Sequence, residues 1–350
     1  MNNQMNQKER FRLTSPDAFF LDATDLTGLE QYLKERYWIS SGVSVATASS
    51  AGEGNMNCTL RVTTTGQSLI VKQSRPWVEK YDQIPAPATR TMIEGQFYQL
   101  IQPQTKISSL MPRFIGIDPI SNIIAMEDLG VSRDFSGMYA GDRLDPTDLA
   151  QLVSYLTQLH EIHPDPRHDL TNRAMRVLNH EYIFHIPLIL DNGLNLDSFT
   201  PGLQSSSLEF KRDTQLISAV ATLGERYLND TGTNLLHGDF YPGSWLRTSQ
   251  GVRVIDPEFC FFGLAEFDLG VLLAHLHLSK QPKTLTTQLM TEYQRVRVLE
   301  PPLTLQFAGV EIMRRLLGVA QVPVHLSLEE KHSLLHLARN WILSPEEGQN

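Results

Sequence analysis

The spacing of apolar residues changes near Gly130, and this change limits the folds open to the chain. Before Gly130, short runs such as "CTLRVTT" and "SLIVKQ" alternate with glycine turns, which is typical of β-strands. After it, apolar residues recur every three or four positions over long stretches, which indicates helices. With 350 residues the chain also exceeds the size that one core usually serves. We therefore expect an α+β fold of two lobes, β-rich over residues 1–127 and mainly helical over residues 128–350.

Individual elements follow from the same patterns. The segment "SRPWVEKYDQIPAPATR" is rich in proline, so we expect it to be an irregular functional loop. Asp145 before Pro146 is typical of a helix start, and Ser327 with Glu330 resembles a capping box. We expect strands over residues 43–50, 58–64, 68–73, 111–117 and 123–126, and helices over residues 25–37, 88–101, 145–159, 172–190, 208–228, 264–279, 284–297, 304–320 and 327–343.

Charge and composition exclude several classes of function. The net charge of −9 argues against a nucleic-acid partner, because phosphate backbones are bound by basic surfaces. No run of 18 apolar residues is present, so we expect no membrane-spanning segment. The N-terminus lacks the apolar region of a signal peptide, and the two cysteines are far apart. We expect a soluble cytoplasmic protein that acts on a small molecule.

Three features of the N-terminal lobe suit nucleotide binding. A glycine turn brings backbone N–H groups close to phosphates, since no side chain intervenes. In this chain the turn is "AGEGN", which contains Gly52, Gly54 and Asn55. Lys72, near the end of the strand expected over residues 68–73, can hold the α- and β-phosphates. Glu94 on the following helix can hold that lysine in place. Each feature is common by itself, but their order predicts an ATP site.

Carboxylates follow two short apolar runs in "LLHGDFYPGSWLRTSQGVRVIDPEF". Asp239 follows the first run and is suited to accept a proton from a substrate hydroxyl. Asp256 and Glu258 follow the second run, where carboxylate oxygens can bind Mg²⁺ together with nucleotide phosphates. Ser244 can offer a hydroxyl to the same metal region. The alternative is that these aspartates only cap turns, as aspartates often do.

The motifs together resemble the aminoglycoside phosphotransferase and choline kinase superfamily, which has a protein-kinase-like fold. Within it, "HGDFYPGSWL" with "VIDPEF" is similar to the 5-methylthioribose kinase family, whose corresponding segments have Gly-Ser and "DPEF". The runs "GEGNMNCTLRV", "LIVKQSRPWV", "MEDL", "FFGLAEFDLG" and "RRLLGVAQV" resemble other segments of that family. The likeness extends from Gly52 to Val322. It implies an antiparallel N-terminal sheet, ATP and Mg²⁺ as cofactors, and a homodimer, because members of that family form dimers.

The resemblance also assigns roles to residues. Asp239 would be the catalytic base, and Asp268 would hold the backbone of its loop. Main-chain groups from Glu127 to Leu129 would meet adenine. Nucleotide contacts would come from Gly52, Gly54, Asn55, Lys72, Glu94, Glu127 and Leu129, metal contacts from Ser244, Asp256 and Glu258, and contacts to substrate or transferred phosphate from Tyr241, Arg314 and Arg315.

Two departures from the family bear on the substrate. The catalytic loop has Phe-Tyr-Pro, with Tyr241, where methylthioribose kinases typically have Leu-His-Thr, and no "SWP" element follows Lys72. We expect a kinase for methylthioribose or a related pentose. The alternatives are an aminoglycoside- or choline-type phosphotransferase and a nucleotide-binding scaffold without activity. The patterns H-x-x-E-H and C-x-x-C are absent, so we expect no zinc site.

Overall fold

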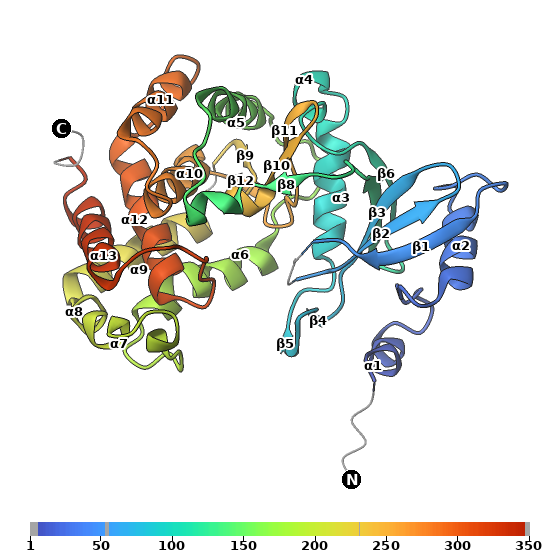
Figure 1. The fold of residues 1–350 in the computed structure, drawn as a ribbon, viewed down its shortest axis with the longest axis horizontal. Coiled ribbons are helices and arrows are strands. Elements are labelled where there is room, and N and C mark those ends of the chain that lie inside the picture. Colours follow the sequence, from blue (N-terminus) through green and yellow to red (C-terminus); the bar gives the residue numbers. More distant parts are fainter. Residues whose placement is uncertain (1–5, 53–55, 231, 347–350) are drawn as a thin grey trace, which may run out of the picture. The chain divides into compact units, whose positions relative to one another are not determined.

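A computed structural model describes residues 6–52, 56–230 and 232–346 (Figure 1). The chain forms two compact units. Unit 1 contains the residues up to Ser132 together with Arg167–Leu170, and unit 2 contains Arg133–Pro166 and the residues from Thr171 onwards. Among the described residues, no helix combines the length and apolar character needed to cross a bilayer.

Unit 1 is built on a five-stranded antiparallel sheet, and the α+β class expected from the sequence is confirmed. Alternate residues of its strands point into a buried core, as Leu69 and Val71 do with no exposed surface. The same alternation produced the sequence prediction. In sheet order the strands are β1 (Val45–Ser50), β2 (Cys58–Thr64), β3 (Ser68–Gln73), β7 (Ile123–Glu127) and β6 (Phe114–Asp118).

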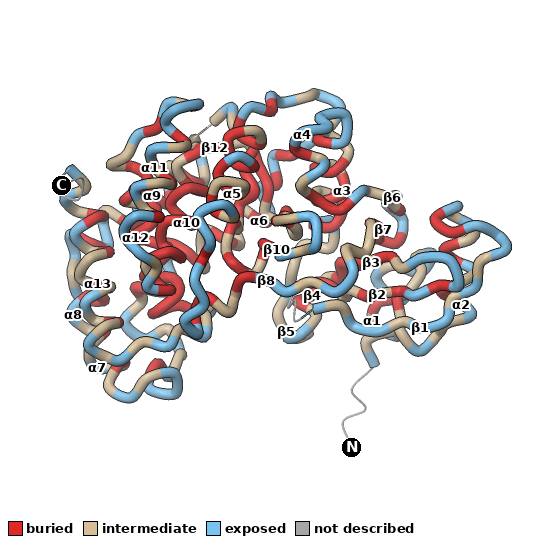
Figure 2. The backbone as a smooth tube through the Cα atoms, turned by 45° about the horizontal axis from the view of Figure 1, so that its top comes forward, coloured by how far each residue is buried: buried red, intermediate tan, exposed pale blue. Residues whose placement is uncertain are grey.

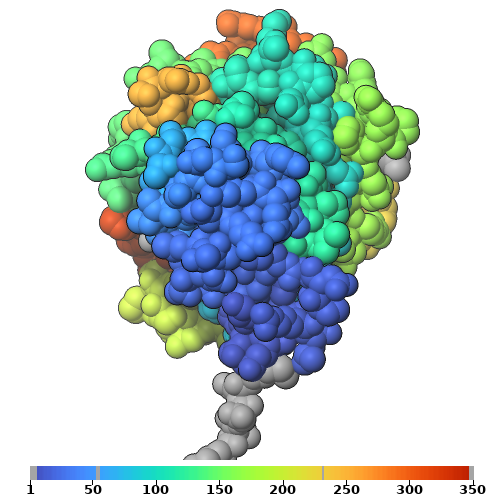
Figure 3. Space-filling view, turned by 90° about the vertical axis from the view of Figure 1, so that its right-hand side faces the viewer, coloured from blue at the N-terminus to red at the C-terminus, as the bar shows by residue number. Residues whose placement is uncertain are grey.

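Helix α2 (Leu26–Glu35) closes one side of this core. Leu29 and Leu33 are fully buried on its inner face, and Tyr32 stacks on Phe19 with ring centroids 4.1 Å apart. Figure 3 shows the N-terminal residues in dark blue forming one continuous surface with the lighter blue residues that follow them. Unit 1 also contains helix α3 (Arg90–Ile101) and two short helices, α1 (Gln7–Thr14) and α4 (Thr105–Ser108).

The segment before α3 (Arg90–Ile101) is more ordered than the sequence suggested. It contains an antiparallel hairpin of β4 (Trp77–Val78) and β5 (Tyr81–Pro85), so the expectation of an irregular loop was wrong here. Arg90 explains the order, since its buried guanidinium donates to the carbonyls of residues 75, 77 and 87 at 2.8–3.1 Å. A single arginine thus satisfies backbone acceptors that proline-rich sequence leaves without strand partners.

Two long helices form the centre of unit 2, α10 (Ala265–Leu278) and α12 (Pro301–Leu317). Both are buried along most of their length, as the red tube in Figure 2 shows. They pack closely at Gly270, where an added Cβ would lie 2.7 Å from the Phe307 Cβ and 2.9 Å from the Ala308 nitrogen. This close approach fixes the helix that carries Arg314 and Arg315. The surrounding helices are α5 (Pro146–Leu159), α6 (Arg173–His180), α7 (Leu203–Ser206), α8 (Leu208–Lys211), α9 (Thr214–Asn229), α11 (Lys283–Gln294) and α13 (Leu328–Leu343).

Two expected helices are interrupted in the structure. In place of the helix expected over residues 172–190, α6 ends at His180, and the chain continues through a π-turn (Glu181–His185) and a 3₁₀ turn (Ile186–Leu188). The helix expected over residues 208–228 divides at Asp213, whose side chain accepts the N–H groups of Gln215 and Leu216 and so starts α9. The helix starts expected at Asp145 and Ser327 are confirmed.

Short strands support the loops of unit 2. Strands β11 (Gly251–Val254), β10 (Trp245–Thr248) and β8 (Arg133–Asp134) form one antiparallel sheet. Strands β9 (Asn234–Leu236) and β12 (Phe261–Gly263) pair antiparallel. Asp239 lies three residues after the end of β9, and Asp256 lies two residues after the end of β11, so each carboxylate follows a largely or partly buried strand.

Candidate active site

The nucleotide-binding residues expected in unit 1 include a buried ion pair. Lys72 on β3 donates to both carboxylate oxygens of Glu94 on α3, at 2.8 and 3.1 Å. Glu94 has no exposed surface, and Lys72 is 8% exposed. Charge-assisted bonds of this kind fix the direction of a long flexible lysine. The structure therefore brings together the lysine and the glutamate that the sequence predicted as partners.

The glycine turn is described only in part. Gly52 follows β1 and has φ of +74°, a conformation that favours glycine. Gly54 and Asn55, which the sequence also assigned to the nucleotide, lie outside the described residues.

The segment after β7 was expected to meet adenine. Its first member, Glu127, is held by β6, because the Glu127 N–H donates to the Arg113 carbonyl at 2.9 Å and the Arg113 N–H donates to the Glu127 carboxylate at 3.0 Å. Asp128 accepts bonds from Arg61 at 2.8 Å and Ser68 at 2.6 Å, and these bonds hold its pKa below the usual range although burial opposes this. The backbone up to Leu129 is thus fixed to the sheet.

In unit 2 the loop after β9 is anchored from helix α10. The carboxylate of Asp268 accepts the N–H groups of His237 at 2.7 Å and Gly238 at 3.0 Å, which confirms the structural role expected for this residue. Gly238 has φ of +83°, and an added Cβ would lie 2.1 Å from the Phe259 carbonyl oxygen. Only glycine fits there, so the turn that presents Asp239 is set by Gly238 and Asp268 together.

Two further side chains fix this loop. His160, the residue that caps the C-terminus of α5, contacts the Asp268 carboxylate at 3.3 Å through Nε2 and the Tyr293 hydroxyl at 2.8 Å through Nδ1. The ring of His237 reaches the Ile255 carbonyl at 2.9 Å through Nε2. The latter contact joins the loop of Asp239 to the residue before Asp256.

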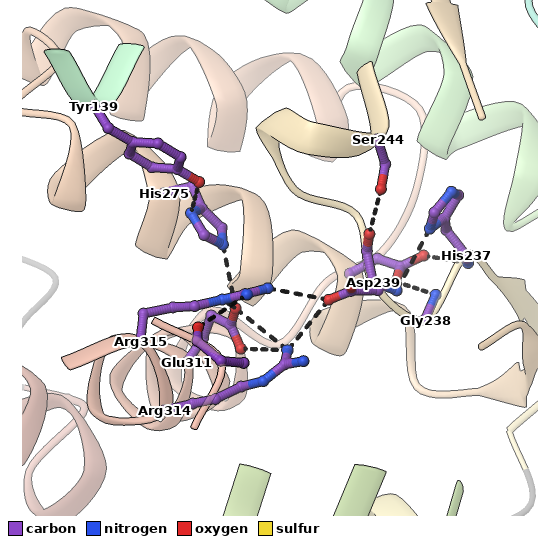
Figure 4. Close-up of polar contacts among 11 residues, drawn as sticks. Tyr139, His237, Gly238, Asp239, Ser244, His275, Glu311, Arg314 and Arg315 are labelled. Atoms are coloured by element: carbon purple, nitrogen blue, oxygen red, sulfur yellow. Dashed lines mark hydrogen bonds and ion pairs between the residues drawn. The ribbon is translucent and has the colours of Figure 1, made fainter. Parts of the chain in front are cut away.

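The two arginines of α12 both contact the expected catalytic base. Arg314 Nη1 lies 3.2 Å and Arg315 Nη2 lies 3.1 Å from the same oxygen, Oδ1 of Asp239. Figure 4 shows the two guanidinium groups pointing from one helix toward this carboxylate. Their helix is buried on the core side, so these are not the arginines of a solvated helix face.

Glu311, one turn earlier on α12, holds both arginines. Its carboxylate accepts bonds from Arg314 Nη1 at 3.1 Å and Arg315 Nε at 2.6 Å. Although burial alone would raise the pKa of Glu311, the two guanidinium charges and His275 hold it well below its usual range. The site thus contains a cluster of two cations and two anions, Arg314, Arg315, Glu311 and Asp239, which we call the α12 charge cluster.

His275 and Tyr139 lie behind this cluster. His275 is fully buried, with Nε2 at 3.1 Å from the Glu311 carboxylate and Nδ1 at 2.7 Å from the Tyr139 hydroxyl. Burial lowers the pKa of His275 to about 4 even though its bond to Glu311 opposes this. Burial likewise raises the pKa of Tyr139 well above its ordinary value. Both side chains therefore stay neutral near pH 7. The Tyr139 hydroxyl holds the His275 ring, and His275 in turn orients Glu311 by hydrogen bonding.

Tyr241 borders the cluster, in the loop where the sequence departs from the resembled family. The Arg315 guanidinium carbon lies 4.7 Å from the centre of its ring, a cation–π distance. Burial and then the Asp239 charge raise the pKa of Tyr241 to about 12. Its neutral phenol thus lies against Arg315 and within the field of the Asp239 charge.

The residues expected to bind metal follow the two strand ends. Ser244 is buried, and its hydroxyl donates to the Asp239 carbonyl at 3.1 Å. Asp256 has φ of +69°, an uncommon conformation for a side-chain-bearing residue and one often kept at functional sites. Glu258 is buried, and its carbonyl accepts from Asn172 at 2.9 Å. Carboxylate and hydroxyl oxygens suit Mg²⁺, which needs one or two carboxylates besides nucleotide phosphates, so this donor set fits the ion.

Sequence reasoning missed several residues of the site. Glu311 is separated from Arg314 and Arg315 by helix spacing, so an i, i+3 and i, i+4 search around the arginines would have found it. His160, His275 and Tyr139 had no such signal. Their contacts are made across 108, 36 and 136 positions of the sequence, respectively.

Comparison with known proteins identifies relatives by sequence. The family profile described as "Phosphotransferase enzyme family" matches residues 47–299. Methylthioribose kinase of Klebsiella pneumoniae is 27% identical over 261 residues, which cover 71% of this chain. The match spans 64% of the length of that relative.

Solved structures share the fold. The AMP-bound spectinomycin phosphotransferase APH(9)-Ia superposes with a TM-score of 0.53 at 13% identity, covering 91% of this chain and 98% of that one. Choline kinase LicA from Streptococcus pneumoniae superposes with a TM-score of 0.51 at 15% identity, covering 90% of this chain and 99% of that one. At this identity the likeness concerns the fold alone.

Proposed function

Because the chain belongs to the phosphotransferase enzyme family, we propose that it is an ATP- and Mg²⁺-dependent kinase for a sugar-like metabolite. The γ-phosphate is transferred to a hydroxyl of methylthioribose or a related pentose. The observation that carries this proposal is the position of Asp239, which follows a strand, is held by an anchored loop and shares one oxygen with two arginines.

Asp239 acts as the base in this mechanism. Since Arg314 and Arg315 both bind Oδ1, the contacts of the described residues leave Oδ2 to accept the proton of the substrate hydroxyl. The hydroxyl oxygen forms the bond to the γ-phosphorus while the bond from that phosphorus to the bridging oxygen of ADP breaks. The proton stays on Asp239 until it is released to water.

The α12 charge cluster supports an uncharged or anionic acceptor. Two guanidinium groups face two carboxylates, so a cationic acceptor finds no uncompensated negative charge there. An anionic phosphoryl group can instead draw the guanidinium groups from Oδ1, and their positive charge then stabilises the phosphoryl charge. The methylthioribose kinase relative favours the same acceptor class over choline or an aminoglycoside.

Asp256 and Glu258, with Ser244 beside them, would hold Mg²⁺. Bound there, the ion offsets negative charge on the nucleotide phosphates. Lys72, oriented by Glu94, would bind the α- and β-phosphates of ATP, and backbone groups up to Leu129 would meet adenine.

A substrate panel tests the proposal. Purified protein with ATP and Mg²⁺ is assayed for ADP release with methylthioribose, other pentoses, choline and aminoglycosides. We expect turnover with a sugar and none with choline. Binding of ATP without phosphate transfer to any compound would instead favour a nucleotide-binding scaffold.

Asp239→Asn tests the assignment of the base. Turnover should fall roughly 10²- to 10⁴-fold, the usual contribution of a general base, while ATP affinity is retained. Unchanged turnover in this variant would remove Asp239 from that role.

A further inference from the structure

We propose that Glu209, His332 and His336 form a binding site for a divalent transition metal, and that the ion is Zn²⁺, which the ligand chemistry fits. We call these residues the α8–α13 triad. None of them belongs to the α12 charge cluster or to the residues assigned to Mg²⁺, so the site is independent of the proposed kinase activity.

Helix spacing brings the two histidines together. His332 and His336 are four residues apart on α13, so they lie on one face, and their ring centroids are 4.5 Å apart. Glu209 reaches them from α8. Its Oε1 contacts His332 Nε2 directly and lies 3.6 Å from His336 Nε2.

One potential ligand atom from each residue lies within 4.8 Å of the other two. Tetrahedral zinc with bonds of about 2.0–2.1 Å places its ligand atoms roughly 3.3 Å apart. Side-chain rotations therefore suffice to close the triad on an ion. The side chains are 39–49% exposed, so an ion can enter from solvent.

The backbone around the triad is held on both helices. The buried ring of Phe210, next to Glu209, packs edge-on against both histidines, with centroids 5.9 and 5.0 Å apart. Arg339, one turn after His336, binds Asp213 at 2.6 Å, and this bond ties α13 to the start of α9. Lys331, the neighbour of His332, donates to Thr200 at 2.7 Å. These contacts hold the backbone positions of the three ligands, so that only their side chains need to rotate when an ion binds.

The donor set selects the ion. Imidazole nitrogens suit zinc and its neighbours, whereas Mg²⁺ prefers oxygen ligands. Two imidazoles and one carboxylate leave a fourth tetrahedral position for water. The expectation of no zinc site depended on the absence of H-x-x-E-H and C-x-x-C. His332 and His336 have a different spacing, H-x-x-x-H.

A plain ion pair between Glu209 and protonated histidine is the competing explanation. The two differ in their response to zinc, because an ion pair that binds no metal is not stabilised by added zinc.

Equilibrium dialysis against ZnCl₂ at pH 7.5, with excess Mg²⁺ to occupy oxygen sites, decides between them. After chelator treatment, the wild-type protein should bind one zinc per chain more than the double variant His332→Asn/His336→Asn. Zinc should raise the thermal unfolding midpoint of the wild type only. Glu209→Gln, which leaves the Phe210 packing intact, should lower zinc affinity at least ~10-fold.

His185→Asn is the matched control. His185 also pairs with a glutamate four residues away, Glu181, but within that exposed pair there is one histidine only. We expect its zinc binding to equal that of the wild type. Equal zinc content and equal midpoint shifts in the wild type, the double variant and Glu209→Gln would overturn the site and leave the ion pair.

Discussion

Each unit has a buried set of charges at its predicted site, and the two sets differ in construction. In unit 1, Lys72 on β3 binds Glu94 on α3, 22 residues further along the chain. In unit 2, Asp239 shares one oxygen between two arginines that lie 75 and 76 residues away and that Glu311 also holds. The bond from Glu94 orients the Lys72 side chain, whereas the shared oxygen of Asp239 makes the members of the α12 charge cluster depend on one another.

Among the substitutions that test this difference, removal of the Glu311 carboxylate should therefore have the largest effect. Glu311→Gln leaves two buried guanidinium groups with one carboxylate, and the loss of a buried partner costs about 3–5 kcal/mol of unfolding free energy. Denaturant unfolding measures this, and an activity assay of the folded variant reports whether Asp239 is still positioned.

Glu181→Gln is the control, because Glu181 pairs with His185 at the surface and should contribute far less. An equally small loss in Glu311→Gln would mean that the arginines are held by Asp239 alone.

The pH dependence of the unfolding free energy should reveal the contribution of His275, which lies behind the α12 charge cluster. Folded His275 stays neutral down to about pH 4, whereas the unfolded chain takes up this proton near pH 6.5. Protons therefore favour the unfolded state between these values, and the unfolding free energy falls by roughly 3 kcal/mol as pH is lowered from 6.5 to 4. In His275→Gln the unfolding free energy should therefore decline by roughly 3 kcal/mol less over this pH range, which denaturant unfolding at several pH values measures.

His277→Gln sharpens this test. Burial lowers the pKa of His277 to about 4 as well, and it lies on the same helix without a bond to Glu311. Both variants should flatten the profile, but only His275→Gln should also reduce turnover. Equal turnover in the two variants would show that His275 contributes burial and not positioning.

Disruption of the Lys72–Glu94 pair in unit 1 should change the KM for ATP and leave the KM for the phosphate acceptor unchanged. If Lys72 binds the ATP phosphates as proposed, Lys72→Met removes a charge-assisted bond worth about 1.5–3 kcal/mol, so the KM for ATP should rise roughly 10- to 150-fold. The KM for the acceptor should not change. Arg36→Gln, which breaks a partly exposed pair with Asp118 on β6 of the same sheet, is the comparison and should leave both constants near the wild-type values.

The smallest effect is expected at Ser244. Ser244→Ala removes one neutral hydrogen bond to the Asp239 carbonyl, worth about 1 kcal/mol, so kcat should fall roughly fivefold or less. If the hydroxyl also serves the metal, the Mg²⁺ concentration for half-maximal activity should rise. A large fall in kcat at saturating Mg²⁺ would place Ser244 closer to the reaction than its single bond indicates.

Local patterns were sufficient for much of the fold. The alternation in "SLIVKQ" and the caps at Asp145 and Ser327 depend on neighbours in the sequence, and the structure has these elements where they were expected. The hairpin at Trp77–Pro85 was missed because Arg90, rather than strand propensity, orders it. The break at Asp213 was missed because an N-cap aspartate ended an apolar periodicity that otherwise continued.

The sequence by itself determined the family and the types of residue at the candidate site, since Lys72, Asp239 and Asp256 are recognisable from the motifs around them. Only the tertiary structure decided what each charge faces. Arg314 and Arg315 meet Asp239 because α12 packs tightly on α10 at Gly270, and His275 becomes a neutral support because that packing removes it from water. Such contacts depend on three-dimensional distance, which the spacing of residues along a chain does not specify.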